Sequence, residues 1–471
     1  MLVSMDDPPA AAHERRTAFV LAGGGFKGAF ELGALQHLVE TRGITPDIIT
    51  SASAGSILGM VLSQARTREE FTARSADARQ VLLSMTHTDM VFGEQPWMAE
   101  LEGTPFADSL KRLITDRTQP TLPGDDADPD DGDGDGDVGD LPARAHHRHS
   151  WSMLAGVADE VRAVSGARRQ FTRETSSVLN LDPFEAAIRG RVDVGIKPVD
   201  VSLIDRPGLE LRMAVTAVRA RETHYVRNDG TVVANDARTP LREGPPPTDV
   251  IDGAIASSSV PMVFPPRPLG AETYVDGGVL QNIPLAAAVQ LGGQDIFTVV
   301  AVPVHEGRKS LSLWSARQLG FVQTQADNLA YPLPDGCVNT VITPTIEVVG
   351  SFEVHRGLMQ IDIDYGRMRA EETLADLDDG ARRIATECSD TITIERDRAW
   401  HLEHSCIEAG QMTPDQIEAL RGLKRAVRSA VRARTSIGFP EPSGAAGWWT
   451  GFELHSSDIP DTFPDRFDRL D

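Results

Sequence analysis

The chain has 471 residues, of which 41% are apolar, so it can bury a sizeable core in one large domain with additions. Its formal net charge of −23 argues against binding of nucleic acid, because a sequence-independent grip on phosphates needs Lys and Arg. No apolar run approaches the ~18 residues that a membrane-spanning helix requires.

Residues 1–16 contain early acidic residues and lack the apolar stretch of a secretory signal, and we interpret them as a disordered leader. The three cysteines lie far apart and without metal-ligand spacing, which favours a reducing compartment over a disulfide framework: Cys337, Cys388 and Cys406. We therefore expect a cytoplasmic protein that binds no metal.

The first elements alternate between strands and helices. Residues 17–22 form a short apolar run that stops at three glycines, which predicts a buried strand. Residues 27–41 follow a helical period. Residues 47–52 predict a second strand and residues 54–64 a second helix. This order is typical of a mainly parallel sheet with covering helices.

The remaining chain continues this pattern around one interruption. Residues 120–150, with nine aspartates and no basic residue between 125 and 140, cannot build a core and predict a disordered insertion. The pattern turns helical after about residue 376 and becomes an acidic tail from Gly438. Further strands are expected at 209–219, 273–275 and 295–302, and further helices at 182–188, 284–290 and 365–376.

A glycine-rich loop, GGGFKG, occupies residues 23–28 between the first strand and the first helix. Glycines let the backbone bring its amides close to a ligand, and the positive end of the helix adds to their attraction for an oxyanion or a phosphate. Lys27 places a cation beside these amides. The loop also matches G-x-G-x-x-G, a weak dinucleotide-binding signal when it stands alone.

The sequence SASAG at residues 51–55 again lies between a strand and a helix. A serine on such a sharp turn exposes its hydroxyl, and small residues on both sides avoid a clash. Gly55 meets this requirement, whereas Ser51 stands where a glycine is usual. Taken alone, Ser53 is equally compatible with a helix N-cap.

The third motif, YVDGG, occupies residues 274–278 at the end of an expected strand. An acid at the carboxyl end of a strand lies where open α/β sheets bind their ligands, so Asp276 is a candidate functional residue. Taken alone, Asp-Gly-Gly is compatible with a simple turn.

In this order the three motifs resemble those of the patatin-like phospholipases, which have a glycine-rich oxyanion loop, a G-x-S-x-G elbow and a D-G-[AG] motif. The flanking sequences ELGAL, ASSSVP and VDGGVLQNIPL agree with the resemblance, which extends from Thr17 to near Arg369. The resemblance implies an α/β, patatin-like three-layer fold with a mainly parallel central sheet flanked by helices. We expect this hydrolase domain over residues 17–375 and a helical C-terminal extension over 376–471.

The resemblance also implies a serine acyl-ester hydrolase of the phospholipase A or lysophospholipase type, without a cofactor. A Ser–Asp dyad replaces the usual triad: Ser53 is the nucleophile and Asp276 its base. We expect burial to raise the pKa of Asp276, because a carboxylate of ordinary pKa is a poor base for an alcohol. The implied oxyanion donors are the amides of Gly23, Gly24, Gly25 and Gly28.

Two further segments bear on a lipid or acyl-ester substrate. The Met- and aromatic-rich stretch 85–106 predicts either an acyl channel or lid, or an ordinary core element; its apolar residues are Met85, Met90, Phe92, Trp97, Met98, Leu101 and Phe106. The helix that starts at Thr413 is amphipathic, with six basic residues off its apolar face, and is compatible with peripheral membrane contact or with packing inside the protein. The six are Arg421, Lys424, Arg425, Arg428, Arg432 and Arg434.

Three alternatives stay open at this stage. An NAD(P)-binding oxidoreductase would use the glycine loop, but Ser51 to Gly55 occupy the place where it needs an acid. A Ser–His–Asp esterase needs a late histidine, for which the candidates are His355, His401, His404 and His455. An inactive lipid-binding regulator would keep the fold without the chemistry.

Overall fold

The computed structural model describes most of the chain on both sides of the acidic insertion. The described residues are 15–96, 177, 179–241, 248–261, 263–303, 325–455, 459–460 and 463. The acidic insertion 120–150 and the first fourteen residues of the expected leader lie outside them, so those two interpretations remain predictions.

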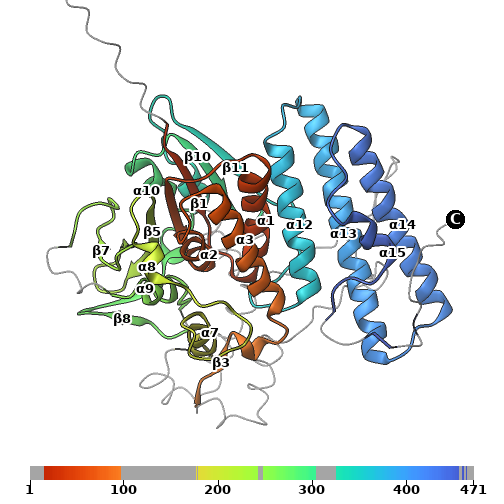
Figure 1. Ribbon diagram of the computed structural model, residues 1–471, viewed down its shortest axis with the longest axis horizontal. Coiled ribbons are helices and arrows are strands. Elements are labelled where there is room, and N and C mark those ends of the chain that lie inside the picture. Colours follow the sequence, from red (N-terminus) through yellow and green to blue (C-terminus); the bar gives the residue numbers. More distant parts are fainter. Residues whose placement is uncertain are drawn as a thin grey trace, which may run out of the picture.

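A mixed sheet of nine described strands forms the centre of the fold (Figure 1). Its main path runs in the order β11-β10-β1-β2-β5-β6-β7. The first five of these strands pair in parallel: β11 (Val338–Ile342), β10 (Asp295–Val299), β1 (Thr17–Leu21), β2 (Ile48–Ala52) and β5 (Glu210–Ala217). The other strands pair antiparallel: β6 (Glu222–Arg227), β7 (Val232–Val233), β8 (Arg267–Leu269) and β9 (Glu272–Asp276). The expected α/β class with a mostly parallel sheet is confirmed.

Helices cover both faces of the sheet, and the strand β1 shows why. Its residues alternate, with Phe19 and Leu21 in one apolar core and Ala18 and Val20 in another. The larger core includes residues of α1 (Gly28–Gln36), α2 (Ala54–Leu62), α3 (Arg68–Ser84), α9 (Val250–Ser257) and α12 (Arg356–Thr373). The smaller core includes residues of α10 (Leu285–Gln290). Two short helices, α7 (Asp182–Ile188) and α8 (Val201–Ile204), and a small β-pair, β3 (Gly93–Glu94) with β4 (Leu179–Asn180), complete this part.

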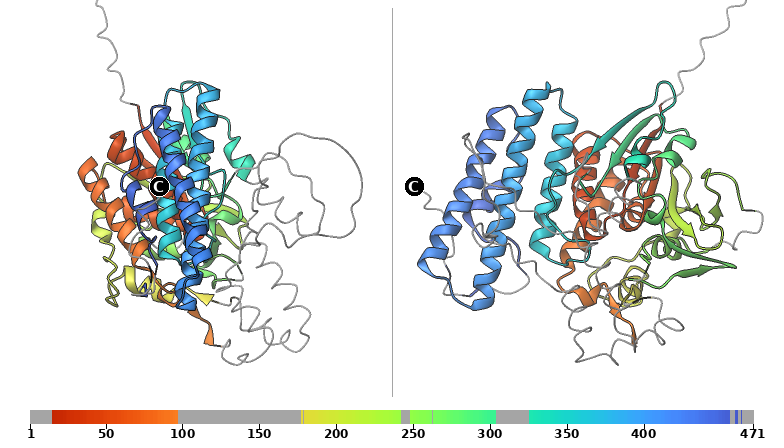
Figure 2. Two further views of the ribbon diagram at one scale, coloured as in Figure 1. Left: turned by 90° about the vertical axis from the view of Figure 1, so that its right-hand side faces the viewer. Right: turned by 180° about the vertical axis from the view of Figure 1, so that it is seen from behind.

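The C-terminal part is helical, as expected, and consists of α13 (Asp379–Ala409), α14 (Pro414–Ser436) and α15 (Ala445–Thr450). In both Figure 1 and Figure 2, α12 lies between α1 and the α13–α14 pair. The capping box at Thr413 and Gln416 sets the start of α14. No described helix is long and apolar enough to cross a membrane.

The structure corrects one expectation about this part of the chain and decides between two alternatives for another. The helix expected at 365–376 starts at Arg356 and ends at Thr373, because Gly357 and Gly366 weaken the helical pattern without ending the helix. Of the six basic residues of α14, which the sequence left compatible with membrane contact or with packing inside the protein, Lys424 and Arg434 are fully buried and form ion pairs with Glu403 and with α12 carboxylates. Of the remaining four arginines, Arg425 and Arg432 are exposed, and Arg421 and Arg428 are partly buried.

Helices α1 and α12 contact each other closely through glycine. A Cβ added at Gly366 would overlap the carbonyl oxygen of Phe30, and one at Gly33 would overlap that of Ile363. We expect Gly366→Ala to destabilise the protein by about 1–3 kcal/mol, because the two backbones must move apart. Urea denaturation followed by circular dichroism measures the change.

The matched control is Gly422→Ala in α14, where an added Cβ would meet no atom within 4 Å. The same substitution should there stabilise the protein by about 0.5–1 kcal/mol, since alanine is the better helix former. Equal stability of Gly366→Ala and the wild type would show that the helices do not need this close approach.

Candidate active site

Ser53 lies on a sharp turn between β2 and α2. Its backbone has φ of +51° and ψ of −132°, in the positive-φ region that residues other than glycine rarely adopt. Such a conformation costs of order 1–3 kcal/mol and persists only where the surroundings enforce it. Gly55 contributes to this, because a Cβ there would lie 2.5 Å from the carbonyl oxygen of Ala22. The chain therefore holds Ser53 in an elbow.

The serine at position 51, where a glycine is usual, is accommodated by other small and hydroxyl-bearing residues. Ser56 Oγ lies 3.2 Å from Ser51 Oγ and 2.8 Å from Ser257 Oγ. Ser257 Oγ in turn accepts the Ser53 N–H at 3.0 Å and donates to the Ala214 carbonyl at 2.6 Å. This buried network fixes the elbow to α9 and β5. Ser257 belongs to the quoted sequence ASSSVP, but its supporting contact was not foreseen.

Asp276 lies next to Ser53 although the two residues are far apart in sequence. Ser53 Oγ donates a hydrogen bond of 2.6 Å to Asp276 Oδ2, and the Gly278 N–H donates one of 2.7 Å to Oδ1. Thr216 Oγ1 donates to the carbonyl of Asp276 at 2.9 Å, and the Asp276 N–H donates to the carbonyl of Ser259 at 2.9 Å. These bonds hold both the carboxyl group and the backbone of Asp276.

The reason for this placement differs from the one expected. The sequence predicts Asp276 at the carboxyl end of a strand in a mainly parallel sheet, but β9 runs antiparallel to β5. Asp276 pairs with Val215, whose neighbour Ala214 pairs with Ala52 at the end of β2. The register of β9, and not its direction, therefore brings the carboxyl group to the elbow.

Burial governs the protonation of Asp276, which is only 4% exposed. Desolvation of the carboxylate raises the pKa of Asp276 to about 7, and the hydrogen bonds from Ser53 and Gly278 oppose this rise. A carboxyl group with this pKa is ionised in part at neutral pH and can accept a proton from a neighbouring hydroxyl.

The glycine loop touches the elbow directly: a Cβ added at Gly23 would lie 2.6 Å from Ser53 Cβ. The N–H of Gly23 donates to the Asn282 carbonyl at 3.3 Å, and the N–H of Gly28 donates to carbonyls of its own turn. In contrast, the N–H groups of Gly24 and Gly25 have no acceptor among the described residues. The four glycines named from the sequence thus divide into two with engaged amides and two with amides open to a ligand.

One further amide without a described acceptor belongs to Ala54, the first residue of α2. It follows Ser53 directly, which is where a strand–serine–helix elbow supplies an oxyanion donor. The elbow motif itself would have identified this amide. Asn282 was also missed: its Nδ2 donates to the Gly23 carbonyl at 3.2 Å, so it joins the segment after Asp276 to the glycine loop.

The cation of Lys27, which the sequence places beside the loop amides, is paired with a carboxylate. Its side chain is 4% exposed and its ammonium group lies 2.9 Å from Glu347 Oε1. The cation is therefore already balanced by a carboxylate from the chain segment that follows β11.

The four candidate histidines gather at a different place, around Trp400 of α13. The ring of Trp400 lies 4.7 Å from His404, 5.1 Å from His355 and from His401, and 5.3 Å from His455, measured between centroids. In the described part of the chain no hydrogen bond joins a histidine to Ser53 or Asp276. The geometry thus favours a two-residue site over the triad alternative.

An aromatic cluster adjoins the glycine loop. Phe92 packs against Phe26, Phe264 and Phe352, with ring centroids 5.9, 5.5 and 5.9 Å away. Phe26 directly follows Gly25, so this apolar surface begins at the loop. Of the apolar stretch that was considered for an acyl channel or lid, Met85, Met90 and Phe92 are described, whereas Trp97, Met98, Leu101 and Phe106 lie outside the described residues.

Comparisons with known proteins agree with the motifs. Residues 19–289, more than half of the chain, match the family model described as patatin-like phospholipase. Over 102 residues the chain is 31% identical to patatin-like phospholipase domain-containing protein 7 of Rattus norvegicus and 30% identical to that of Mus musculus. The matched stretch is 21% of this chain, and it spans only 7% of the length of each relative.

Among solved structures, the chain is similar to VipD from Legionella pneumophila, with 13% identity and a TM-score of 0.28 over 96% of this chain and 94% of that one. It is also similar to the type III effector protein ExoU, with 12% identity and a TM-score of 0.22 over 92% of this chain and 78% of that one.

Proposed function

The chain belongs to the patatin-like phospholipase family, and on this premise we propose that it is a lipid acyl-ester hydrolase that works with a dyad of Ser53 and Asp276. The observation that carries the proposal is the 2.6 Å hydrogen bond from Ser53 Oγ to Asp276 Oδ2 at a strained elbow. A nucleophile within hydrogen-bond reach of a base is the arrangement that covalent catalysis needs.

The reaction proceeds through two acyl transfers. Ser53 Oγ attacks the ester carbonyl while its proton passes to the Asp276 carboxylate, which then protonates the leaving alcohol. Asp276 next takes a proton from a water molecule as that water attacks the carbonyl of the acyl-enzyme. When the second intermediate collapses, Asp276 returns this proton to Ser53 Oγ, so the fatty acid leaves and both side chains are regenerated. Two negatively charged tetrahedral intermediates form on this path.

The oxyanion of each intermediate is bound by backbone amides. The N–H groups of Gly24, Gly25 and Ala54 are the candidates, since they have no acceptor within the described residues. Ala54 directly follows Ser53, and the two glycines directly follow Gly23, which lies against Ser53. Loss of a single donor of this kind typically slows an acyl transfer about 10²- to 10³-fold. The engaged amides of Gly23 and Gly28 instead hold the loop in shape.

The substrate is a phospholipid or lysophospholipid, and its acyl chain lies along the aromatic cluster of Phe26, Phe92, Phe264 and Phe352. This placement is supported by Phe26, which follows the open amide of Gly25 and so connects the reacting carbonyl to an apolar surface. Flexible methionines nearby, such as Met85 and Met90, suit chains of variable shape.

The test is a panel of purified substrates: diacyl phospholipids, lysophospholipids, neutral glycerides and a short-chain nitrophenyl ester. We expect release of fatty acid from phospholipid or lysophospholipid and slower release from the soluble ester, which cannot use the aromatic surface. Hydrolysis of the soluble ester alone would contradict the lipid assignment. Absence of all hydrolysis, with Ser53 unreactive toward a fluorophosphonate, would instead favour a lipid-binding protein without catalysis.

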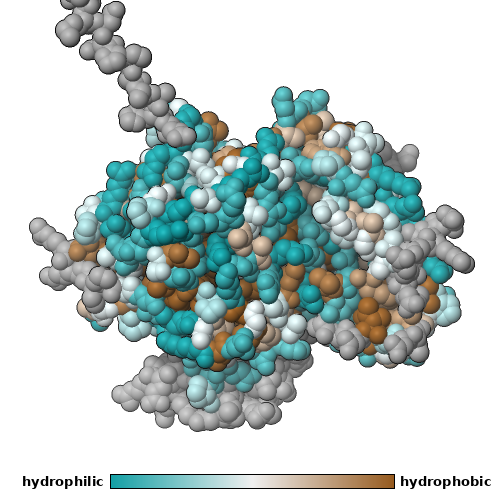
Figure 3. Space-filling view, in the orientation of Figure 1, coloured by the Kyte–Doolittle hydropathy of each residue, from teal (hydrophilic) through white to brown (hydrophobic). Residues whose placement is uncertain are grey.

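Peripheral membrane contact through α14 is part of the same proposal. Arg421, Arg425, Arg428 and Arg432 follow the spacing of one helical face. Within the described part of the chain, ion pairs are formed by Arg421 and Arg425, both with Glu418. The protein as a whole is acidic, with a net charge of −23, so these arginines are a local exception. Their positive charge favours an anionic lipid surface as the partner of this helix. On the face shown in Figure 3, the C-terminal helices present hydrophilic, intermediate and hydrophobic residues side by side, so the proposed contact rests on the charge of these arginines.

We expect the double variant Arg428→Gln/Arg432→Gln to bind vesicles rich in anionic lipid roughly 10- to 30-fold more weakly, at about 1 kcal/mol for each arginine. Vesicle co-sedimentation at low and at high salt measures this. The matched control is Arg383→Gln/Arg398→Gln, which removes two arginines from the exposed part of α13. Equal losses in the two double variants would contradict a specific role of the α14 arginines.

A further inference from the structure

A segment outside the family-matched residues packs against the glycine loop. It comprises residues 343–354, between β11 and α12, and is called the clamp segment below. The Phe26 N–H donates to the Ser351 carbonyl at 3.1 Å, and a Cβ at Gly25 would overlap that same carbonyl. With φ of +62°, Gly25 is the residue that allows this close approach.

The strongest contact between the clamp segment and the loop is the ion pair of Lys27 with Glu347. Its N–O distance is 2.9 Å, and the two side chains are only 4% and 11% exposed. Lys27 ends the 3-10 turn Gly25–Lys27, so its position is rigidly linked to the open amides of Gly24 and Gly25. Little water screens such a pair, and its geometry is therefore strongly preferred over alternatives.

Two more carboxyl groups lie beneath the loop but do not replace Glu347. Glu31 accepts the Ala22 N–H at 2.8 Å, and Asp362 accepts the Phe30 N–H at 3.1 Å. Burial raises the pKa of both Glu31 and Asp362 well above the ordinary range. Among the described residues, the carboxylate in ion-pair contact with Lys27 is that of Glu347.

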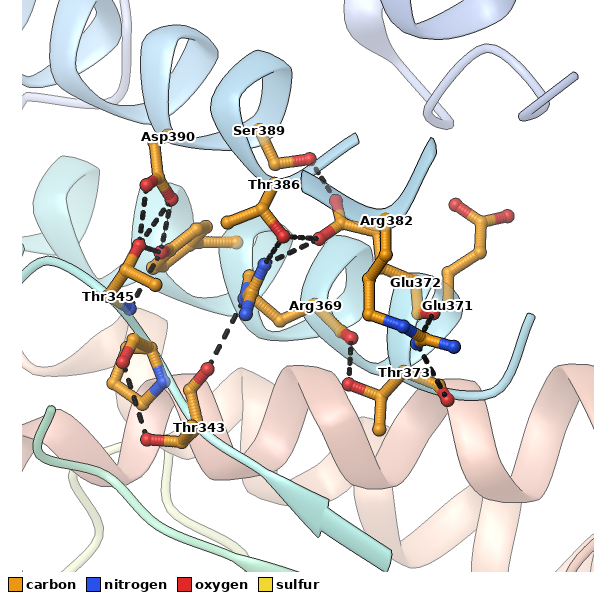
Figure 4. Close-up of polar contacts among 12 residues, drawn as sticks. Thr343, Thr345, Arg369, Glu371, Glu372, Thr373, Arg382, Thr386, Ser389 and Asp390 are labelled. Atoms are coloured by element: carbon orange, nitrogen blue, oxygen red, sulfur yellow. Dashed lines mark hydrogen bonds and ion pairs between the residues drawn. The ribbon is translucent and has the colours of Figure 1, made fainter. Parts of the chain in front are cut away.

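The other end of the clamp segment is anchored to the helices (Figure 4). The Thr345 N–H donates to the Tyr365 hydroxyl at 3.0 Å, and Thr345 Oγ1 donates to the Asp390 carboxylate at 2.6 Å. Tyr365 also donates to Asp390 at 2.7 Å, and Arg369 Nε donates to the Thr343 carbonyl at 3.2 Å. The segment is thus fixed to α12 and α13 two residues before Glu347.

We propose that Glu347 is a positioning residue, which holds the amides of Gly24 and Gly25 in place for the oxyanion by fixing Lys27. The proposal rests on the hydrolase function proposed above and adds to it a residue from beyond residue 289, where the family match ends. Oxyanion donors must lie within a few tenths of an ångström of their target position, and a misplacement of 1 Å can cost about 100-fold in rate. A residue that fixes the loop therefore acts on kcat more than on KM.

The experiment compares Glu347→Gln with the wild type on one ester substrate. We expect kcat to fall about 10- to 100-fold with KM changed less than about threefold, because the amides act on the transition state. The rate of Ser53 phosphonylation by a fluorophosphonate should fall in parallel, since its tetrahedral adduct uses the same donors. The matched control is Glu453→Gln, which removes the carboxylate from another buried pair, that of Arg396, in the C-terminal part.

Stability is controlled by the double variant Lys27→Met/Glu347→Gln, which leaves no unpaired ammonium group in the interior. We expect it to regain thermal stability relative to Glu347→Gln but to keep the low kcat. A kcat within about twofold of the wild type in a folded Glu347→Gln or double variant would overturn the proposal, as would an equal loss of kcat in Glu453→Gln. If Ser53→Ala hydrolyses the ester as fast as the wild type, the proposed function fails. The role of Glu347 in the loop is then still tested by the rate of Ser53 phosphonylation, compared between Glu347→Gln and the wild type.

Discussion

Replacement of Ser53 by alanine is expected to lower ester hydrolysis by roughly 10⁴- to 10⁶-fold, the range seen when the nucleophile of a serine hydrolase is removed. The substitution deletes the attacking oxygen and the donor of the 2.6 Å bond to Asp276, but leaves the loop amides in place. The backbone at residue 53 keeps its positive φ, so the fold of the elbow should persist.

Steady-state hydrolysis with the preferred lipid and labelling by a fluorophosphonate measure the effect. The matched control is Ser63→Ala, because Ser63 is a buried serine whose hydroxyl donates to the carbonyl of Met60 at the end of α2, away from the reacting groups. The control should keep the activity of the wild type. Full activity in a correctly folded Ser53→Ala would show that another group is the nucleophile.

Replacement of Asp276 by asparagine is expected to lower kcat about 10²- to 10⁴-fold, the contribution typical of a general base. Asparagine has nearly the same shape and can still accept the Gly278 N–H, but it cannot take the proton of Ser53. Hydrolysis rates of the purified variant at pH 8 measure the loss. A variant with unchanged kcat would exclude Asp276 as the base.

The same substitution should stabilise the protein at alkaline pH. The pKa of Asp276 is raised to about 7 in the folded chain, against roughly 4 when unfolded, so the folded state binds the proton more tightly. Stability is therefore lost progressively as the pH rises from about 4 to 7, up to a total of about 4 kcal/mol. Asp276→Asn lacks this penalty.

We accordingly expect the melting temperature of Asp276→Asn to exceed that of the wild type at pH 8, with the difference shrinking toward pH 4. Thermal melts across this range measure it. A difference independent of pH would mean that the carboxyl group is not desolvated in the folded protein. An activity–stability conflict of this kind is common at catalytic sites.

Local patterns in the sequence predicted much of the fold. The strand–glycine–helix and strand–serine–helix units at residues 17–64 appear with boundaries within a few residues, because short apolar runs and glycines act locally. The strands β6 and β11 and the long helix α3 were not predicted. Helix α3 begins with a charged first turn at Arg68 and has few apolar residues. Its apolar residues therefore do not mark out a clear helical period in the sequence.

The sequence predicted the residues of the site but not the contacts between segments that are distant in the chain. The motifs named Ser53, Asp276 and the glycines, but not which amides stay open, since the contacts of Gly23 with Asn282 cross more than 200 residues. Nothing in the sequence near Glu347 marks it as a partner of Lys27. Such contacts follow from the register of β9 and the path of the clamp segment, which only the folded chain reveals.

The pH dependence of Ser53 phosphonylation tests the dyad most directly, because it needs no knowledge of the natural lipid. If Asp276 is the base, the rate for the wild type should rise about tenfold per pH unit up to about pH 7 and then level off, following the ionised carboxylate. In Asp276→Asn the rate should be low and show no such midpoint. Equal rates in the two proteins, or a steady rise through pH 9 without a plateau, would contradict the assignment of Asp276 as the base of Ser53.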